Sequence, residues 1–133
     1  MRTHVENWPN AYERFPMPGI DAGPACRMVH NVAVIDLRGS LEEELSVRSF
    51  YGAIREMLEE GTRNFAINLA EVPGADSYTL GALAGAYNLV RDAGGRIKFF
   101  AASDSLIRAF RKFRLDSVLE LYANEALALT KLR

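Results

Sequence analysis

Short apolar runs alternate with amphipathic helical segments along most of this chain of 133 residues. The runs at 32–37, 65–69 and 96–102 have the length of single buried strands. The helical segments between them are long enough to return the chain to the same end of a sheet, as parallel strands require. This order predicts an α/β fold with a mostly parallel central sheet and right-handed crossovers.

Two long helices are predicted from apolar residues at helical spacing. The first has acidic residues near its start and Gly61 as its C-terminal stop. Its apolar face consists of Val47, Phe50, Tyr51, Ile54 and Leu58. The second ends at Gly94-Gly95, and its apolar face consists of Leu80, Leu83, Ala84, Tyr87 and Val90. Both patterns indicate helices that pack against a sheet.

The remaining elements are predicted from local turn and capping signals. Residues 25–29 pair with 32–37 through a tight turn at His30-Asn31, which makes a hairpin. Ser103, Asp104 or Ser105 caps a third helix, which has Leu106, Ile107, Phe110 and Phe113 on its inner side. Residues 118–122 form a last strand, and Asn124 caps a closing helix that runs to Leu132.

Together these signals predict one α/β domain at 24–133. Its sheet has about five strands and begins with the hairpin, and it carries about four helices. Residues 1–23 show neither the two-residue period of a strand nor the period of about 3.6 residues of a helix. They contain three prolines among aromatic residues, so we expect an irregular N-terminal arm.

Net charge, cysteine count and the length of apolar runs limit the kinds of function that this chain can have. The net charge is −1 with both signs interspersed, which disfavours nucleic-acid binding. The single cysteine, Cys26, can form no internal disulfide and has no zinc-ligand partners at suitable spacing, which favours a reducing cytoplasm. The chain shows no secretory leader and no apolar run of about 18 residues, so we expect a cytoplasmic protein without membrane insertion, metal or cofactor.

Signals for catalysis are weak. His4 lies in the arm and His30 in the hairpin turn, so neither is an evident base for a nucleophile. No phosphate-binding glycine loop follows a strand. Gly81 and Gly85 fall inside the second long helix, where we expect them to permit close packing. We therefore expect no enzymatic activity.

Three polar groups have structural explanations. Residues 42–44 are glutamates at a helix start, where their negative charges interact favourably with the positive end of the helix dipole. Asp36 and Asn68 interrupt apolar strands and are expected to be hydrogen-bonded there. A basic set lies along and just beyond the third helix on a solvated face, where late positive charge interacts favourably with the C-terminal end of the helix dipole or sets the electrostatics of a protein interface. It consists of Arg108, Arg111, Lys112 and Arg114.

The turn at 73–81 joins the strand at 65–69 to the second long helix. Asp76 and Ser77 are predicted at the start of that helix, where small polar side chains cap free N–H groups. The same donors and the positive end of the dipole favour an anion. We therefore interpret Ser77 as a switch, with a purely structural cap as the alternative.

This turn resembles the signature of the STAS domain family, the anti-sigma-factor antagonists. That signature typically reads Asp-Ser-Ser-Gly-Leu-Gly, and this chain has Asp76-Ser77-Tyr78-Thr79-Leu80-Gly81. The resemblance extends over about 24–132, through 34–39, Asn68-Leu69 and Gly94-Gly95. It implies a partner-switching protein that binds an anti-sigma factor that is also a serine kinase, and thereby releases a sigma factor.

The resemblance also implies the site. Phosphorylation of Ser77 by the kinase abolishes binding, and a serine phosphatase restores it. The implied partner-binding residues are Gly74, Ala75, Asp76, Ser77, Tyr78, Thr79 and Leu80. Tyr78 and Thr79 replace the usual serine and glycine, and add two hydroxyls that compete as phosphate acceptors.

Three alternatives remain at this point. One is a STAS scaffold subunit of a stress-sensing or lipid-transport complex that is never phosphorylated. Another is a small nucleotide-binding α/β protein with Asp76 and Ser77 as ligand groups. An aspartyl-phosphorylated receiver is disfavoured, because no acidic pair ends the first strand and no matching lysine follows a later one.

Overall fold

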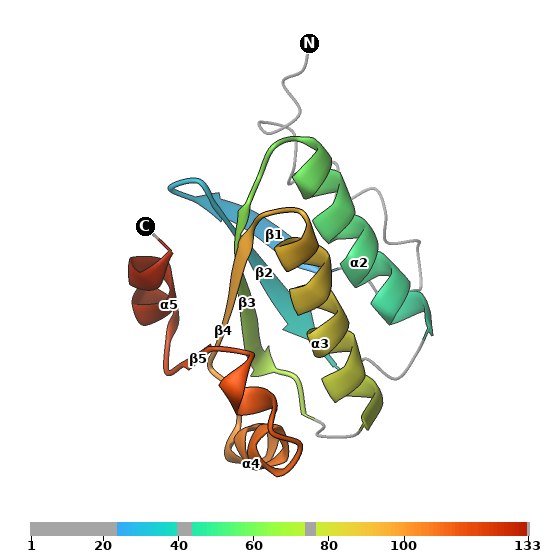
Figure 1. Ribbon diagram of the computed structural model, residues 1–133, viewed down its shortest axis with the longest axis vertical. Coiled ribbons are helices and arrows are strands. Elements are labelled where there is room, and N and C mark those ends of the chain that lie inside the picture. Colours follow the sequence, from blue (N-terminus) through green and yellow to red (C-terminus); the bar gives the residue numbers. More distant parts are fainter. Residues whose placement is uncertain (1–23, 40–43, 74–76, 133) are drawn as a thin grey trace.

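A computed structural model describes residues 24–39, 44–73 and 77–132 of the chain. Its centre is a five-stranded sheet with the order β1-β2-β3-β4-β5 (Figure 1). The strands are β1 (Ala25–Val29), β2 (Val32–Arg38), β3 (Asn64–Glu71), β4 (Arg96–Phe100) and β5 (Leu121–Tyr122). β1 is antiparallel to β2, and all later pairs are parallel, with Ile35 opposite Ile67 and Ile67 opposite Phe99. The predicted mostly parallel sheet that begins with a hairpin is confirmed.

The helices of the described residues are α2 (Glu44–Glu59), α3 (Ser77–Asp92), α4 (Asp104–Lys112) and α5 (Glu125–Lys131), with a short 3₁₀ turn, η2 (Leu115–Ser117). Because each strand is added on the same side of the previous one, right-handed crossovers place the connecting helices on one face of the sheet. Figure 1 shows α2 and α3 side by side on that face and α5 on the other.

The hairpin turn follows the local prediction. His30 has φ 49° and Asn31 has φ 71°. Two consecutive left-handed residues give a turn whose twist matches that of the strands it joins. The turn therefore sets the register in which Val29 pairs with Val32.

Strand alternation divides the core into two layers. In β2, Ala33, Ile35 and Leu37 belong to the larger cluster, which is shared with α2, α3 and α4. Val32 and Val34 belong to a smaller cluster that α5 covers with Ala128 and Leu132. Since side chains alternate between the two faces of a strand, burial on both faces explains the nearly continuous apolar run.

α2 and α3 approach closely at Gly85. A Cβ atom at this position would overlap the Tyr51 hydroxyl and lie 3.1 Å from Tyr51 Cζ. That hydroxyl donates a 2.7 Å hydrogen bond to the Ala82 carbonyl oxygen. The packing role expected of Gly85 is therefore confirmed. The same expectation was wrong for Gly81, which faces open space.

The capping predictions at α4 and α5 are confirmed. The Ser103 hydroxyl accepts a hydrogen bond from Leu106 N at 3.1 Å, and the Asn124 side chain accepts one from Leu127 N at 3.0 Å. These bonds satisfy N–H groups that have no partner within the helix. Both signals lie within three residues of the groups they cap.

The last predicted strand is wrong over most of its length. Arg114 has φ 60° and ends α4, and both Val118 N and Leu119 N donate to the Leu115 carbonyl oxygen. This turn leaves only residues 121 and 122 for β5. Phe113 was also expected on the inner side of α4, but it lies just past the last helical turn and is 53% exposed.

β4 is shorter than predicted for a related reason. Ala101 has φ 64°, a left-handed conformation outside the β region, and β4 ends at Phe100. The predicted arm at 1–23 lies outside the described residues, as do the glutamates at 42 and 43. The domain limits of 24–133 therefore stay a prediction.

Candidate functional site

Ser77 is the first residue of α3, at the carboxyl edge of the parallel strands. Two short-range bonds turn the chain as it leaves β3: Ala70 N donates to Asn68 Oδ1 at 3.0 Å, and Val72 N donates to the Leu69 carbonyl oxygen at 3.1 Å. Val72 is buried and anchors this turn. The turn and α3 together hold Ser77 at the edge of the sheet where ligands and partners of open α/β proteins bind.

Exposure distinguishes the three neighbouring hydroxyl groups. Ser77 is exposed and Tyr78 is 70% exposed, whereas Thr79 is completely buried. Leu80 is buried beside Thr79, so these two residues hold α3 against the domain. Of the predicted partner-binding residues, Ser77 and Tyr78 are at the surface. Gly74, Ala75 and Asp76 lie outside the described residues.

The charge pattern of α3 leaves its first turn open to an added negative charge. No acidic residue lies in the first turn, and Arg91 lies in the last. The positive end of the helix dipole favours an anion at the first turn by about 0.3–1 kcal/mol per charge. The α3 dipole therefore compensates only a small part of the charge that a phosphate would add at this helix start.

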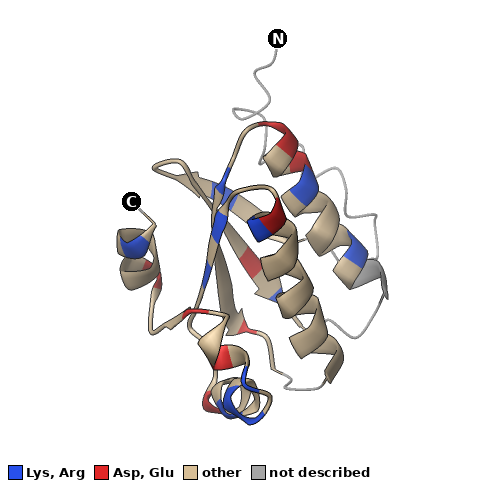
Figure 2. Ribbon diagram, in the orientation of Figure 1, with Lys and Arg blue, Asp and Glu red and all other residues tan. Residues whose placement is uncertain are grey.

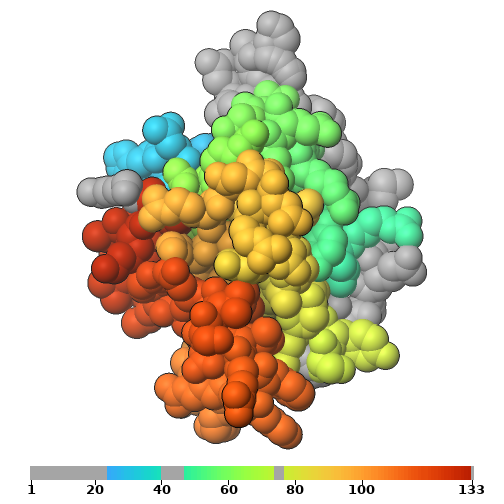
Figure 3. All heavy atoms as spheres, in the orientation of Figure 1, coloured from blue at the N-terminus to red at the C-terminus, as the bar shows by residue number. Residues whose placement is uncertain are grey.

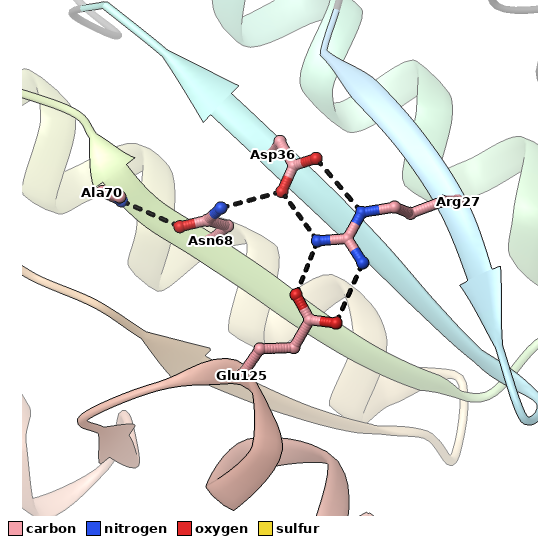
Figure 4. Close-up of polar contacts among 5 residues, drawn as sticks. All are labelled: Arg27, Asp36, Asn68, Ala70 and Glu125. Atoms are coloured by element: carbon pink, nitrogen blue, oxygen red, sulfur yellow. Dashed lines mark hydrogen bonds and ion pairs between the residues drawn. The ribbon is translucent and has the colours of Figure 1, made fainter.

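A polar network connects four elements on the face that carries α5 (Figure 4). Arg27 of β1 contacts Asp36 of β2 at 3.4 Å and Glu125 of α5 at 2.6 Å. Asn68 of β3 donates to Asp36 at 2.9 Å. Asp36 and Asn68 are thus hydrogen-bonded structural groups, as expected from the sequence.

The contact between Arg27 and Glu125 shifts the pKa values of these two groups in opposite directions. The hydrogen bond from Arg27 lowers the pKa of Glu125, and the bond to Glu125 raises the pKa of Arg27. The side chains of Arg27 and Glu125 are 43% and 32% exposed, so water screens the pair. Its main effect is to position α5 over the sheet.

A second ion pair joins β4 to the segment before β5. Lys98 Nζ lies 2.6 Å from Glu120 Oε1, and the Tyr122 hydroxyl donates to the same oxygen at 2.8 Å. The hydrogen bond from Lys98 lowers the pKa of Glu120. The largely buried ammonium group of Lys98 therefore has a carboxylate partner, as a buried charge requires.

The groups considered for catalysis are not assembled in the described part of the chain. Cys26 is buried, and burial raises the pKa of its thiol to about 12. His30 lies in the hairpin turn with a left-handed backbone. In the same ranges, three or more His, Cys, Asp or Glu residues are nowhere close enough together to hold a metal ion. None of the described helices is both long and apolar enough to cross a membrane.

Comparisons with known proteins agree with this architecture. The family model described as the STAS domain matches residues 24–128. An anti-sigma factor antagonist from Mycobacterium paratuberculosis superposes with a TM-score of 0.70 at 22% identity, covering 83% of this chain and 92% of that one. The unphosphorylated form of the anti-sigma factor antagonist SpoIIAA gives a TM-score of 0.68 at 21% identity, covering 84% and 96%.

The phosphorylated form of SpoIIAA, a Bacillus cell fate determinant, is also similar. It gives a TM-score of 0.64 at 20% identity and covers 84% of this chain and 100% of that one. At this level of identity the likeness establishes a shared fold, in which the site residues have to be judged by their own geometry.

Proposed function

The chain belongs to the STAS domain family, and on that premise we propose that it is an anti-sigma-factor antagonist controlled by phosphorylation at Ser77. In its unphosphorylated form it binds an anti-sigma factor that is a serine kinase, and a sigma factor is released. The kinase phosphorylates Ser77, the complex dissociates, and a serine phosphatase regenerates the binding form. The protein performs no catalysis of its own and acts as a substrate of both enzymes.

The observation that carries this proposal is the exposure of Ser77 beside the burial of Thr79. A kinase must reach the acceptor hydroxyl and place it against the terminal phosphate of ATP. Ser77 offers its hydroxyl at the first residue of α3, whereas Thr79 would become accessible only if α3 unwound. Tyr78 is accessible, but its phenol extends much farther from the backbone than a serine hydroxyl.

Electrostatics supports the loss of binding after phosphorylation. A phosphate adds close to two negative charges, and α3 compensates by only about 0.3–1 kcal/mol per charge. Burying an unpaired phosphate beneath a partner costs on the order of 2–5 kcal/mol, by analogy with broken interfacial charge pairs. This range corresponds to about 30-fold to several-thousand-fold weaker binding.

The fold itself need not change for the partner to leave. Thr79, Leu80 and Leu83 are buried just after Ser77, so α3 is held in place by its inner face. In this proposal Ser77, Tyr78 and the predicted residues Gly74, Ala75 and Asp76 contact the partner. Thr79 and Leu80 position them from below.

The test combines phosphate mapping with binding. The protein is incubated with ATP and each purified anti-sigma serine kinase of its source organism, and phosphate is mapped by mass spectrometry. We expect one phosphate, at Ser77. Binding of the same kinases is then measured by calorimetry for wild type, Ser77→Ala and Ser77→Glu, and Ser77→Glu should bind at least about 30-fold more weakly than Ser77→Ala.

Ser105 provides a matched control inside the same chain. It is exposed near the start of α4 and follows Asp104, as Ser77 follows Asp76. A kinase that recognises the α3 surface should leave Ser105 unmodified. Phosphate at Ser105 instead of Ser77 would remove Ser77 from the proposed role.

The alternatives give different results in the same experiments. A constitutive scaffold subunit would bind its partner equally well as Ser77→Ala and Ser77→Glu. A nucleotide-binding protein would bind ATP or GTP tightly in calorimetry in the absence of any kinase. Either result would contradict the proposal.

A further inference from the structure

A pocket of about 410 Å³ opens between α4, η2 and β5. Its apolar walls include Ile107, Leu119 and Leu121, and its charged edges are Arg111 and Asp116. It lies just beyond the carboxyl ends of β4 and β5, the edge at which open α/β sheets bind ligands. The pocket is large enough for one or two side chains of another molecule.

One cation, Arg111, lines this pocket, and three more lie on α4 or just after it. Arg108, Arg111, Lys112 and Arg114 are all exposed. None of them forms an ion pair with another described residue. Arg108 and Arg111 are neighbours on the surface of α4, because residues three apart lie on the same side of a helix.

This charge is concentrated at one place in a chain whose net charge is −1. Between residues 104 and 118 the only carboxylates are Asp104 and Asp116. Figure 2 shows the blue Lys and Arg residues gathered on α4. The same segment projects from the lower end of the molecule in Figure 3, with no described element over its outer side.

Two apolar side chains are exposed beside the cations. Phe113 is 53% exposed and Val118 is 43% exposed, although the inner face of α4 buries Leu106 and Phe110 completely. Exposed apolar groups next to a pocket and a charged rim are typical of protein interaction sites. An aromatic side chain and arginines are also the residue types that contribute most to such interfaces.

We propose that this surface, residues 104–118 together with the pocket, binds an acidic segment of a partner protein. One aliphatic or aromatic side chain of the segment enters the pocket between Ile107 and Leu121, and its carboxylates pair with Arg108, Arg111 and Lys112. Phe113 packs against the segment outside the pocket. The site is separate from Ser77 and does not depend on phosphorylation.

The surface fits a peptide better than a nucleic acid or a membrane. Single-stranded nucleic acids require a series of aromatic platforms, but of the two aromatic residues in the segment 104–118 Phe110 is buried and only Phe113 is exposed. A membrane-bound helix inserts its apolar face, but in α4 that face is buried in the domain. A pocket with apolar walls, beside cations that form no ion pair with another described residue, instead accepts a side chain flanked by carboxylates.

Fluorescein-labelled peptides test the proposal directly. The first peptide is Glu-Glu-Asp-Leu-Phe-Glu-Glu, the second replaces its Leu-Phe with Gly-Ser, and the third replaces its acids with lysines. Binding is measured by fluorescence polarisation, and the site is mapped by amide shifts in nuclear magnetic resonance spectra. We expect only the first peptide to bind well, with shifts confined to α4, η2 and β5, and with weaker binding at higher salt.

Variants of exposed residues provide the quantitative part of the test. Arg108→Glu with Arg111→Glu should weaken binding at least about fivefold, since two attractive pairs become repulsive. The corresponding double glutamine variant should have a smaller effect in the same direction. Phe113→Ala should weaken binding with the fold unchanged, and Asp116→Asn should strengthen it by removing a repulsive carboxylate from the pocket edge.

Two controls separate this site from others. Arg91→Glu changes an exposed cation on α3 and should leave peptide binding unchanged. Ser77→Glu should also bind the peptide as wild type does, so failure of the phosphorylation proposal and failure of this one are distinguishable.

Several outcomes would overturn the proposal. They are equal binding of the first two peptides, shifts outside α4, η2 and β5, and an unchanged affinity in the double glutamate variant. Binding to vesicles of phosphatidylglycerol or to a single-stranded oligonucleotide without binding to the first peptide would also reject it, in favour of a membrane or nucleic-acid surface.

Discussion

The contact between Gly85 and Tyr51 gives a sharp test of how α2 and α3 pack. We predict that Gly85→Ala destabilises the protein, although alanine is the better helix former by about 1 kcal/mol. The new methyl group overlaps the Tyr51 hydroxyl, which must move away from the Ala82 carbonyl oxygen that it now contacts at 2.7 Å. The perturbation therefore affects a hydrogen bond and a packed ring together.

The expected size follows from three contributions. Losing the hydrogen bond costs about 0.5–1.5 kcal/mol, and displacing the ring costs about 1–3 kcal/mol as overpacking. The higher helix propensity of alanine stabilises α3 by about 1 kcal/mol and offsets part of this cost. The net decrease in the free energy of unfolding is about 0.5–3.5 kcal/mol, which urea denaturation followed by circular dichroism can measure.

Gly81 is the matched control in the same helix. A Cβ atom there meets nothing within 4 Å, so Gly81→Ala should increase the free energy of unfolding by about 0.5–1 kcal/mol. The two glycines lie four residues apart in α3, and the same substitution should therefore have opposite signs.

A double-mutant cycle identifies the cause. Tyr51→Phe removes the hydroxyl and leaves Cζ at 3.1 Å from the new methyl group, so Gly85→Ala should be nearly neutral in that background. The coupling energy should be at least about 0.5 kcal/mol. Equal costs of Gly85→Ala in both backgrounds, or stabilisation as in Gly81→Ala, would refute this account of the α2–α3 contact.

Three further results are expected. The pKa of Glu120 and of Glu125 is lowered in the folded state, so each carboxylate stabilises the fold above its ordinary pKa, and this contribution is lost as the pH falls through the lowered value. Because both groups are partly exposed, we expect about 0–1 kcal/mol each, and Glu120→Gln and Glu125→Gln should lose less stability than wild type between pH 7 and pH 3 in urea titrations. Ala101→Gly should be neutral or stabilise by up to about 1 kcal/mol in thermal denaturation, because Ala101 has φ 64°, whereas Ala101→Val should destabilise. Cys26, with a pKa of about 12, should react with a disulfide reagent at pH 8 orders of magnitude more slowly in the folded protein than in guanidinium chloride, and rapid labelling of the native thiol would contradict its burial.

Local signals predicted most of the architecture. The Ser103 and Asn124 caps act on N–H groups three residues away, so their effect depends on little outside the segment. The left-handed turn at His30-Asn31 is equally local. The apolar strands and helix faces follow from periodicity, because burial on a face requires apolar residues at that spacing.

Errors arose where a residue's environment depends on distant elements. The pattern near residues 118–122 is apolar enough for a strand, yet Arg114 ends α4 in a left-handed conformation and the chain turns through η2 first. Phe113 has the spacing of an inner residue, but α4 ends before it. The last strand therefore had too few residues left to pair with β4.

In the candidate site, too, the local features were predictable from sequence and those that depend on tertiary packing were not. The sequence alone predicts Asp76 and Ser77 at a helix start; Ser77 is the first residue of α3, and Asp76 lies outside the described residues. The sequence offers Thr79 as a competing hydroxyl, but Thr79 is buried, and its spacing of four residues from Leu83 is consistent with a position on the inner face of α3. Its burial depends on how α3 is rotated against the sheet.

By itself the sequence determined the order of the elements, the direction of the strands and the position of the serine at the start of a helix. These properties follow from periodicity and from hydrogen bonds that span a few residues. Only the tertiary structure decided that Arg27 meets Glu125, that Gly85 rather than Gly81 lies against another helix, and that a pocket opens beside α4. Those features depend on which separate segments meet in space, and the local sequence pattern of a segment does not specify which distant segment it contacts.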